Sequence, residues 1–372
     1  MELILDILLN PVVIALLKIV VIVLVFVAAT GTVMTLMERK WMSAVQDRIG
    51  PNRANIPFLR DFRGRGALHM AADGLKSIFK EDTVPEGVDL VIFTIAPFFG
   101  FISAVVIWAV IPFAAPIGDF TFQITDVNIG ILLVFAVTSL GIYGTVLAGW
   151  SSNNKYALLG AARGTSQMLS YEIFLGLSLV GVFMVNGSVQ VSILVANQNT
   201  YWFGDVIPKW GLFTQPLAFV MFFTAMLAEA KRLPFDAPEG ESEIIAGYFM
   251  EYSGMRYAAF MLAEYIAMVG IAALVTTLFL GGYHVPWLHA EGFQIFGWFM
   301  AVPVWLVSAL QILAFVGKII FFCWLIIMVR WTIPRFRFDQ IMELGWKKLL
   351  PLSLANIVVT ALVLLAVDNW NL

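Results

Sequence analysis

The sequence predicts an all-α polytopic membrane protein, one membrane domain over residues 1–372 with about eight transmembrane helices and amphipathic helices on the cytoplasmic side. Of the 372 residues, 60% are hydrophobic and only 13% are charged, whereas soluble domains average about 25% charged residues. Seven stretches carry no charge, and each is long enough for the roughly 20 residues that a helix needs to cross a bilayer. They are Leu90–Pro116, Val127–Asn154, Ile173–Gly204, Trp210–Ala228, Tyr265–Ala290, Gly292–Gly317 and Leu349–Val367.

These stretches, together with the apolar run near the N-terminus, predict spans at 12–37, 89–114, 128–150, 169–194, 211–230, 257–283, 306–331 and 349–367. The region from Pro286 to Trp331 has room for two spans. A second span there would place the basic segment 330–348 on the opposite side from the other basic connections. We therefore expect an interfacial or re-entrant helix near Gly292–Trp305, broken at Pro303, and a single span after it.

The positions of Lys and Arg predict the orientation in the membrane. Nineteen of the 22 basic residues lie in four alternate connections, 38–88, 151–168, 231–256 and 330–348. Short connections rich in Lys and Arg remain on the cytoplasmic side. We therefore expect these connections in the cytoplasm, with 330–348 as the last cytoplasmic loop, and both termini on the periplasmic side.

The composition also excludes several classes of function. A net charge of −3 provides no basic surface for nucleic acid. The single cysteine, Cys323, cannot form a disulfide or an iron–sulfur cluster within the chain. The histidines, His69, His284 and His289, have no partner at metal-ligand spacing. We expect no metal site and no cofactor bound by this chain itself.

The first cytoplasmic connection, 38–88, contains a predicted amphipathic helix. Between Ala67 and Lys80, apolar residues recur at helical spacing and polar residues occupy the opposite stripe. Such a helix suits a membrane surface or a partner protein. A plain surface helix in which Asp73 pairs with Lys76 explains the pattern equally well.

Four ionisable residues fall inside predicted spans: Lys18, Glu172, Glu264 and Lys318. A charge at membrane depth is costly, so such residues are usually paired or functional. One interpretation is two ion pairs between helices, each joining a glutamate to a lysine. The other is a hydrated polar route for protons or for a polar headgroup.

A concentration of acids marks the predicted acidic cytoplasmic loop, 229–256, and the start of the next span. Seven of the 25 acidic residues fall there, interrupted by apolar pairs such as Ile244-Ile245. This interruption favours a folded, partly buried element over a solvated acidic loop. Clustered carboxylates raise one another's pKa values, which would let the segment hold and release protons near neutral pH. The seven acids are Glu229, Asp236, Glu239, Glu241, Glu243, Glu251 and Glu264.

Longer motifs occur in the polar segments from residue 38 to about residue 351. They are Glu38–Lys40, Gln46–Asn52, Ala72–Lys76, Ser152–Tyr156, Gln167–Glu172, Leu233–Glu243 and Pro334–Gln340. Their types and their order resemble one family, the quinone-channel membrane subunit of respiratory complex I (the H subunit of NADH–quinone oxidoreductase, mitochondrial subunit 1 type). We interpret Glu38–Lys40 as the start of a helix that ends in the Gln46–Asn52 motif.

The resemblance implies a subunit of a proton-pumping oxidoreductase in a bacterial inner (plasma) membrane, at the junction of the membrane arm with the soluble arm. It implies a chamber through which the substrate, a quinone (ubiquinone or menaquinone), reaches an iron–sulfur cluster of a neighbouring subunit. NADH and the iron–sulfur clusters would belong to soluble partners, while other membrane partners pump protons and membrane lipid surrounds the chain. No complete active site is expected in this chain alone.

The resemblance also implies roles by position. The implied chamber residues are Glu38, Arg39, Arg48, Asp73, Arg232, Asp236, Glu239, Glu241 and Glu243. The implied proton route consists of Glu172, Glu229, Glu251 and Glu264. The family usually has Glu-Thr-Asn-Arg where this chain has Glu229–Arg232, so Lys231 adds a positive charge beside the acidic loop.

Two other functions stay open at this point. A related membrane subunit of an energy-converting hydrogenase would share much of the pattern without using a quinone. A stand-alone proton-coupled transporter would also carry acids in a polytopic membrane protein, although the lack of an internal repeat counts against it.

Overall fold

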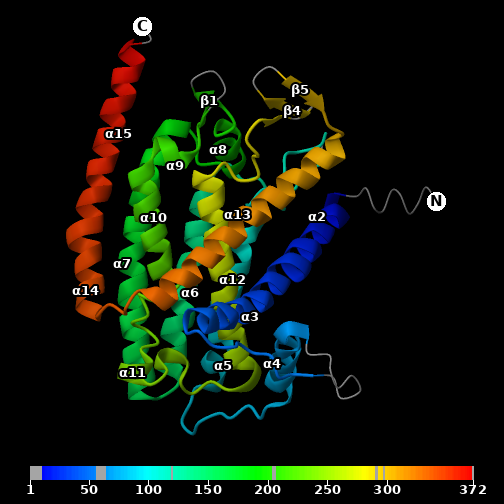
Figure 1. Ribbon diagram of the computed structural model, residues 1–372. Coiled ribbons are helices and arrows are strands. Elements are labelled where there is room, and N and C mark those ends of the chain that lie inside the picture. Colours follow the sequence, from blue (N-terminus) through cyan, green and yellow to red (C-terminus); the bar gives the residue numbers. More distant parts are fainter. Residues whose placement is uncertain are drawn as a thin grey trace.

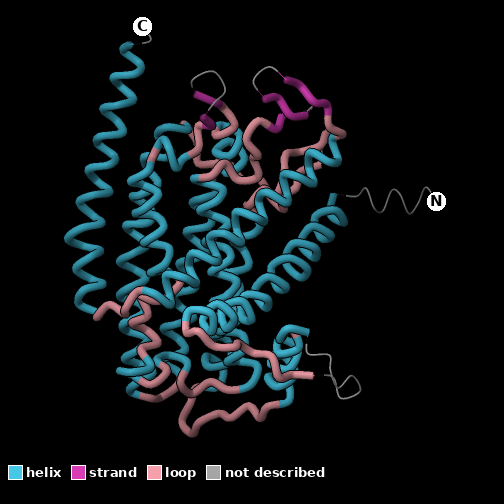
Figure 2. The backbone as a smooth tube through the Cα atoms, in the orientation of Figure 1, coloured by secondary structure: helices cyan, strands magenta, loops and turns pink. Residues whose placement is uncertain are grey.

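The computed structural model describes residues 11–55, 64–118, 120–202, 207–289, 292–295 and 298–370. Figure 1 shows a bundle of long helices with short strands at one end and the small helices α4 (Leu68–Phe79) and α11 (Glu241–Ile244) at the other. Figure 2 shows that the strands are confined to the first of these ends. We call the two ends of the bundle the strand end and the loop end.

Seven helices of the described part are long and apolar enough to cross a membrane, which confirms the all-α polytopic fold class. The first is formed by α2 (Pro11–Ile19), η1 (Val20–Val27) and α3 (Ala28–Val45) in succession. The last is formed by α14 (Phe338–Glu343), η5 (Leu344–Leu349) and α15 (Leu350–Trp370). Between them are α5 (Leu90–Val106) with η3 (Ile107–Ala109), α6 (Gly130–Ser151), α7 (Lys155–Asn186), α12 (Gly254–Phe279) and α13 (Val304–Thr332).

The predicted span at 211–230 is a shorter helix. It consists of α9 (Gly211–Thr214) and α10 (Pro216–Glu229). At 1.5 Å per residue, the 14 residues of α10 rise about 21 Å, less than the roughly 30 Å of a bilayer's hydrocarbon core. The segment that follows, which we call the 230–253 loop, contains α11 and η4 (Gly247–Phe249) and packs partly inside the bundle.

Several predicted boundaries are wrong. The connection expected at 151–168 is helical from Lys155 onward, because Asn154 caps α7 by accepting a 2.8 Å hydrogen bond from the Tyr156 N–H. The span expected to reach residue 194 ends at Asn186, and α8 (Val191–Asn197) is a separate helix. Glu38–Lys40 does not begin a helix, since α3 runs through it. The last basic loop shrinks to residues 333–337, because α13 and α14 extend into the segment 330–348.

The helix expected near Gly292–Trp305 is also wrong. The structure has a three-stranded antiparallel sheet of β3 (Leu288–His289), β4 (Gly292–Ile295) and β5 (Trp298–Ala301). These strands contain aromatic residues such as Phe293 and Phe299, which favour strands, and Gly292 has a φ of +146°, which no helix accommodates. α13 begins directly after Pro303, so the region contributes one span and not two. A second small sheet at the same end pairs β1 (Tyr201–Trp202) with β2 (Ile207–Pro208).

α12 is the central helix of the bundle. In its most apolar window, 61% of the residues are buried, compared with 12% for the first long helix and 17% for the last. α12 packs against α5, α13 and α3, and the core around it contains fully buried side chains such as Trp108, Phe222, Phe279 and Phe315. The first and last long helices therefore lie at the edges of the bundle, as Figure 1 shows for α15.

The 230–253 loop is held against α7 by close contacts. Gly247 has a φ of +59°, and a Cβ there would lie 1.8 Å from the Pro238 carbonyl oxygen. A Cβ on Gly160 of α7 would lie 2.7 Å from the Gly247 Cα. The Gln167 side chain, also on α7, donates hydrogen bonds to the Ala228 and Phe235 carbonyls at 2.8 and 2.7 Å. The loop backbone is thus fixed where no side chain fits between it and α7.

Replacing Gly160 by Ala should loosen this contact. Overpacking a close contact costs about 1–3 kcal/mol, so we expect faster hydrogen exchange across the 230–253 loop, measured by mass spectrometry on the assembled protein. Gly176→Ala is the matched control in the same helix, because a Cβ there meets nothing within 4 Å. Equal exchange of the loop in both variants would contradict the prediction.

Candidate functional site

Charged side chains at the loop end meet inside the bundle in small groups. The innermost of the ion-paired groups joins three elements: Glu38 of α3, Arg232 of the 230–253 loop and Arg330 of α13. Glu38 and Arg232 are 4% and 6% exposed. Arg232 Nη1 lies 3.4 Å from a Glu38 oxygen, Arg330 contacts the other oxygen, and the guanidinium of Arg232 stacks over the Tyr265 ring at 4.6 Å. One carboxylate therefore compensates two arginines.

Asp236 forms a second group with the segment after α13. Its carboxylate pairs with the Arg335 guanidinium, which also donates a 3.2 Å hydrogen bond to Ser242 Oγ. Burial raises the pKa of Asp236, and the hydrogen bond and charge of Arg335 offset part of the rise. The contact ties the 230–253 loop to residues 333–337.

The third group contains Glu239, Glu264, Tyr248 and Lys231. The side chains of Glu239 and Glu264 are hydrogen-bonded to each other. Burial raises the pKa of Glu239 well above its ordinary range, and the Glu264 charge raises it further. Of the two carboxyl groups, Glu239 is therefore the one whose protonated form these surroundings favour. Tyr248 donates a 3.0 Å hydrogen bond to Glu264 Oε1, and Lys231 Nζ donates to Tyr248 Oη at 3.2 Å.

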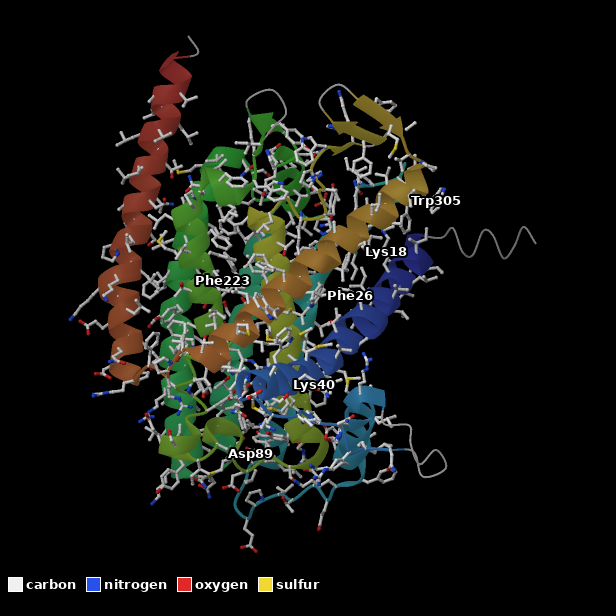
Figure 3. The ribbon with its side chains drawn as sticks, in the orientation of Figure 1. Lys18, Phe26, Lys40, Asp89, Phe223 and Trp305 are labelled. Atoms are coloured by element: carbon white, nitrogen blue, oxygen red, sulfur yellow. The ribbon has the colours of Figure 1, made fainter. Side chains whose placement is uncertain are left out.

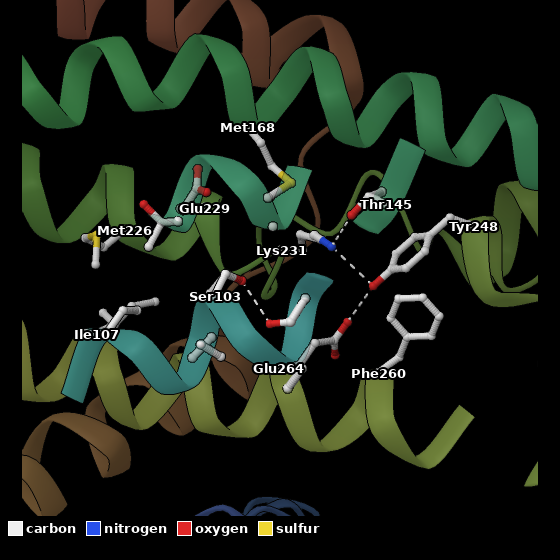
Figure 4. Close-up of a pocket in the computed structure, with 18 residues that line it drawn as sticks. Ser103, Ile107, Thr145, Met168, Met226, Glu229, Lys231, Tyr248, Phe260 and Glu264 are labelled. Atoms are coloured by element: carbon white, nitrogen blue, oxygen red, sulfur yellow. Dashed lines mark hydrogen bonds between the residues drawn. The ribbon is translucent and has the colours of Figure 1, made fainter. Parts of the chain in front are cut away.

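A cavity of about 90 Å³ extends from this third group toward the strand end. Figure 4 shows Lys231, Tyr248 and Glu264 along part of its wall and Glu229 beside Met226 on another part. A water molecule needs about 10–15 Å³ of such space, so the cavity has room for several. A smaller cavity of about 20 Å³ follows, with Glu229 and Glu172 both in its lining. Glu172 accepts a hydrogen bond from Ser139 of α6.

The remaining predicted residues lie nearer the surface of the loop end. Arg39 pairs with Asp73 of α4 at 2.7 Å, and both side chains are more than 40% exposed. Glu243 pairs with Arg163 of α7 at 2.6 Å. Arg48 is exposed and donates to Gln46, while Glu251 accepts a 2.7 Å hydrogen bond from Asn154 and does not line either cavity. The side chain of Glu241 lies outside the described part of the structure.

The two lysines inside predicted spans do not pair with the glutamates, so the interpretation as two helix-to-helix ion pairs is wrong. Lys318 Nζ donates to three backbone carbonyls just beyond α12, those of Leu280, Gly282 and His284 at 2.7–2.9 Å. Lys18, which lies toward the strand end in Figure 3, far from Lys40 at the loop end, donates to Thr121 Oγ1 and the Gln123 carbonyl. Glu172 and Glu264 remain available to the polar route.

Comparison with known proteins identifies the family. The model of the NADH dehydrogenase family matches residues 17–361. The NADH-quinone oxidoreductase H subunit 1 of Geobacter metallireducens is 44% identical over 332 residues, 88% of this chain and 90% of that protein. The corresponding H subunit of Thermomicrobium roseum is 44% identical over 336 residues (89% and 90%), and H subunit 1 of Cytophaga hutchinsonii is 41% identical over 330 residues (88% and 90%). This chain belongs to the NADH dehydrogenase family.

Membership of the NADH dehydrogenase family confirms the resemblance predicted from the motifs. The relatives are named as H subunits of an NADH-quinone oxidoreductase. Among the residues that the structure describes, no group of three or more His, Cys, Asp or Glu side chains is placed to hold a metal ion.

In this member of the NADH dehydrogenase family, several site residues were not predicted. Arg330 and Arg335 compensate predicted acids, yet their sequence signal, basic residues after a span, indicates only orientation. Tyr248 and Thr145 contact Lys231, and Ser139 contacts Glu172. A hydroxyl residue within or beside an apolar helix has no pattern of its own, so no signal in the sequence could have found these three.

Glu38→Ala should destabilise the protein strongly. The substitution leaves Arg232 and Arg330 without their shared partner, and removing one member of a buried ion pair costs about 3–5 kcal/mol. We expect a lower melting temperature of the purified assembly and less of this chain in the membrane.

Asp73→Ala is the stability control for that prediction. It breaks the exposed pair with Arg39, and exposed pairs contribute about 0–1 kcal/mol. The prediction is wrong if both variants lower the melting temperature equally.

Proposed function

We propose that this chain forms the quinone-access chamber of an NADH–quinone oxidoreductase and couples quinone reduction to proton translocation. The observation that carries the proposal is the polar route through the bundle. It begins at the Glu239–Glu264 pair, crosses the larger cavity to Glu229, and continues through the smaller cavity to Glu172.

The chamber lies at the loop end, where α3, α4, the 230–253 loop and residues 333–337 converge. Of the residues assigned to it, Glu38, Arg232, Asp236 and Glu239 are fixed in the groups described above, and Arg39, Asp73 and Glu243 form ion pairs around them. Arg48 and Glu241 are assigned to the chamber from their sequence motifs alone. The relatives are named for a quinone, and the chamber would receive the same class of substrate.

The route responds to chemistry in the chamber by charge. Quinone reduction consumes protons and creates transient negative charge where water is scarce. The interaction between charges grows as the effective dielectric constant falls, so this charge favours proton uptake by Glu239 and its neighbours. Glu264, Glu229 and Glu172 then pass the change inward, while Glu251 lies at the rim of the loop, held by Asn154.

The orientation follows from the same arrangement. We place the loop end in the cytoplasm of a bacterium and both termini on the periplasmic side of the inner membrane, because Lys and Arg concentrate at the loop end. Soluble subunits that carry NADH and the iron–sulfur clusters dock there. Membrane proton-pumping subunits and lipid cover the outer helices, such as α15 with its exposed Leu354, Val358 and Leu362.

Glu264→Gln tests the route. Glutamine keeps the shape of the side chain and one oxygen that can accept the Tyr248 hydrogen bond, but it cannot ionise. Loss of a proton-transfer group costs about 10²-fold to 10⁴-fold in rate, so we expect proton translocation coupled to quinone reduction in proteoliposomes to fall on the order of a hundredfold. Reduction of ferricyanide by NADH, which reports on electron flow into the soluble arm, should be unchanged.

The control for this experiment is Glu343→Gln on α14, whose exposed carboxylate pairs with Lys347 at 2.9 Å. This variant should pump like the wild type. Normal proton translocation by Glu264→Gln would rule the route out.

A further inference from the structure

Lys231 is a partly buried cation with an unusual backbone. It follows α10 by two residues and has a φ of +54°, a left-handed conformation that only a few per cent of non-glycine residues adopt. Conformations of this kind are strained and persist only where the surroundings enforce them. Here the turn directs the side chain into the cavity that Glu229 and Glu264 also line.

The ammonium group of Lys231 begins an unbroken line of hydrogen bonds. Nζ donates to Thr145 Oγ1 at 2.7 Å and to Tyr248 Oη at 3.2 Å. Tyr248 in turn donates to Glu264 Oε1 at 3.0 Å, as the dashed lines in Figure 4 show. A hydroxyl that accepts on one side and donates on the other can pass a proton along the line. Burial and the Glu264 charge raise the pKa of Tyr248 well above its ordinary range, so the phenol keeps a proton to pass.

The series of hydrogen bonds does not continue from Lys231 to Glu229. Glu229 Oε2 is buried and has no hydrogen-bond partner among the described residues. An ammonium has three N–H donors, and Thr145 and Tyr248 account for two of those on Lys231. The four-carbon stem of lysine is flexible, and the cavity lies between its ammonium and Glu229 (Figure 4). A rotation of the side chain within the cavity would bring Nζ toward Glu229.

We propose that Lys231 transfers protons between the Glu239–Glu264 pair and Glu229. In the direction of the observed hydrogen bonds, the Lys231 ammonium gives a proton to Tyr248, and Tyr248 gives its own proton to the Glu264 carboxylate: an N–H bond breaks at Nζ, an O–H bond forms at Glu264, and a neutral amine remains. The amine then takes a proton from the Glu229 carboxylic acid and becomes an ammonium again, which leaves a carboxylate at Glu229. This inference rests on the proposed function and adds to it the group that bridges the two halves of the route.

The surroundings of Lys231 fit a side chain that gains and loses a proton. Burial lowers the pKa of Lys231, whereas the carboxylates that face it, Glu264, Glu239 and Glu229, act in the opposite direction. The adjacent Arg232 cannot fill this role, because it pairs with Glu38 and an arginine does not deprotonate in proteins.

The experiment compares Lys231→Arg with Lys231→His in the assembled complex. Arginine keeps the positive charge but cannot release a proton. The rate of proton translocation coupled to quinone reduction should therefore fall on the order of a hundredfold, while ferricyanide reduction and assembly are kept. Histidine has an ordinary pKa near 6.5, compared with about 10.4 for lysine, so it should restore part of the activity, with the pH optimum moved to lower pH.

Lys231→Arg with wild-type translocation and a wild-type pH profile would overturn the inference, because a fixed positive charge would then suffice. If the larger arginine prevents assembly, Tyr248→Phe decides: it keeps the ring packing against Phe249 and Phe260 and removes only the hydroxyl. Translocation should fall in Tyr248→Phe, and normal translocation there would overturn the inference too. Lys18→Arg, at the strand end, is the control and should pump normally.

Glu229→Gln and Glu264→Gln, measured in the same assay, separate this inference from the proposed function. If both pump normally, the whole route is wrong. If both stop pumping while Lys231→Arg pumps normally, the route stands and only the role of Lys231 fails.

Discussion

Charges inside this bundle must be compensated by other parts of the same chain, since neither lipid nor a packed core can replace the water that solvates them. This constraint explains the groups at the loop end. Glu38 lies between two arginines, Asp236 pairs with Arg335, and Lys318 satisfies its ammonium with three backbone carbonyls. Because each charge depends on its neighbours, a change of protonation at one member alters the free energy of all the others.

The same constraint governs the backbone of the 230–253 loop. Irregular backbone at membrane depth is tolerated only where protein or a water-filled cavity surrounds it. α7 supplies this surrounding: Gly160 lets the backbone at Gly247 approach closely, and Gln167 satisfies the carbonyls of Ala228 and Phe235. α10 has only 14 residues, fewer than the roughly 20 that a helix needs to cross a bilayer, and the loop that follows it packs partly inside the bundle, where its backbone needs such partners.

The sequence predicted those features that depend on neighbouring residues and missed those that depend on distant ones. Apolar runs located the long helices, because burial in lipid is a local property of a stretch of sequence. The helix cap at Asn154 is also a local signal, but the prediction of a connection over 151–168 did not use it. The sheet at 288–301 was mistaken for a helix, since a short apolar segment suits either structure and its strand pairing is set by the fold.

The acids of the site were predicted, whereas their partners were not. Glu38 meets residues almost 200 and almost 300 positions away, Arg232 and Arg330, and no pattern within a segment indicates such a pairing. The partners of the lysines were likewise not predictable from the sequence around them. Lys318 was a candidate partner for a glutamate, yet it binds carbonyls beyond the end of α12, which only the packing of α13 against α12 determines.

The site has two parts that differ in their cations: arginine, which stays charged, in one part, and lysine, which can exchange a proton, in the other. At the loop end, the described ion pairs around the proposed chamber use arginine, which carries its charge at any physiological pH: Arg39 with Asp73, Arg163 with Glu243, and Arg335 with Asp236. Beside the larger cavity, the cation is Lys231, and Tyr248 and the carboxyl groups of Glu229 and Glu264 line the same cavity. Pairs that include an arginine would hold the geometry of the proposed chamber when its contents change. The inner groups can exchange protons without breaking those pairs, so a protonation change can travel inward while the fold around it stays intact.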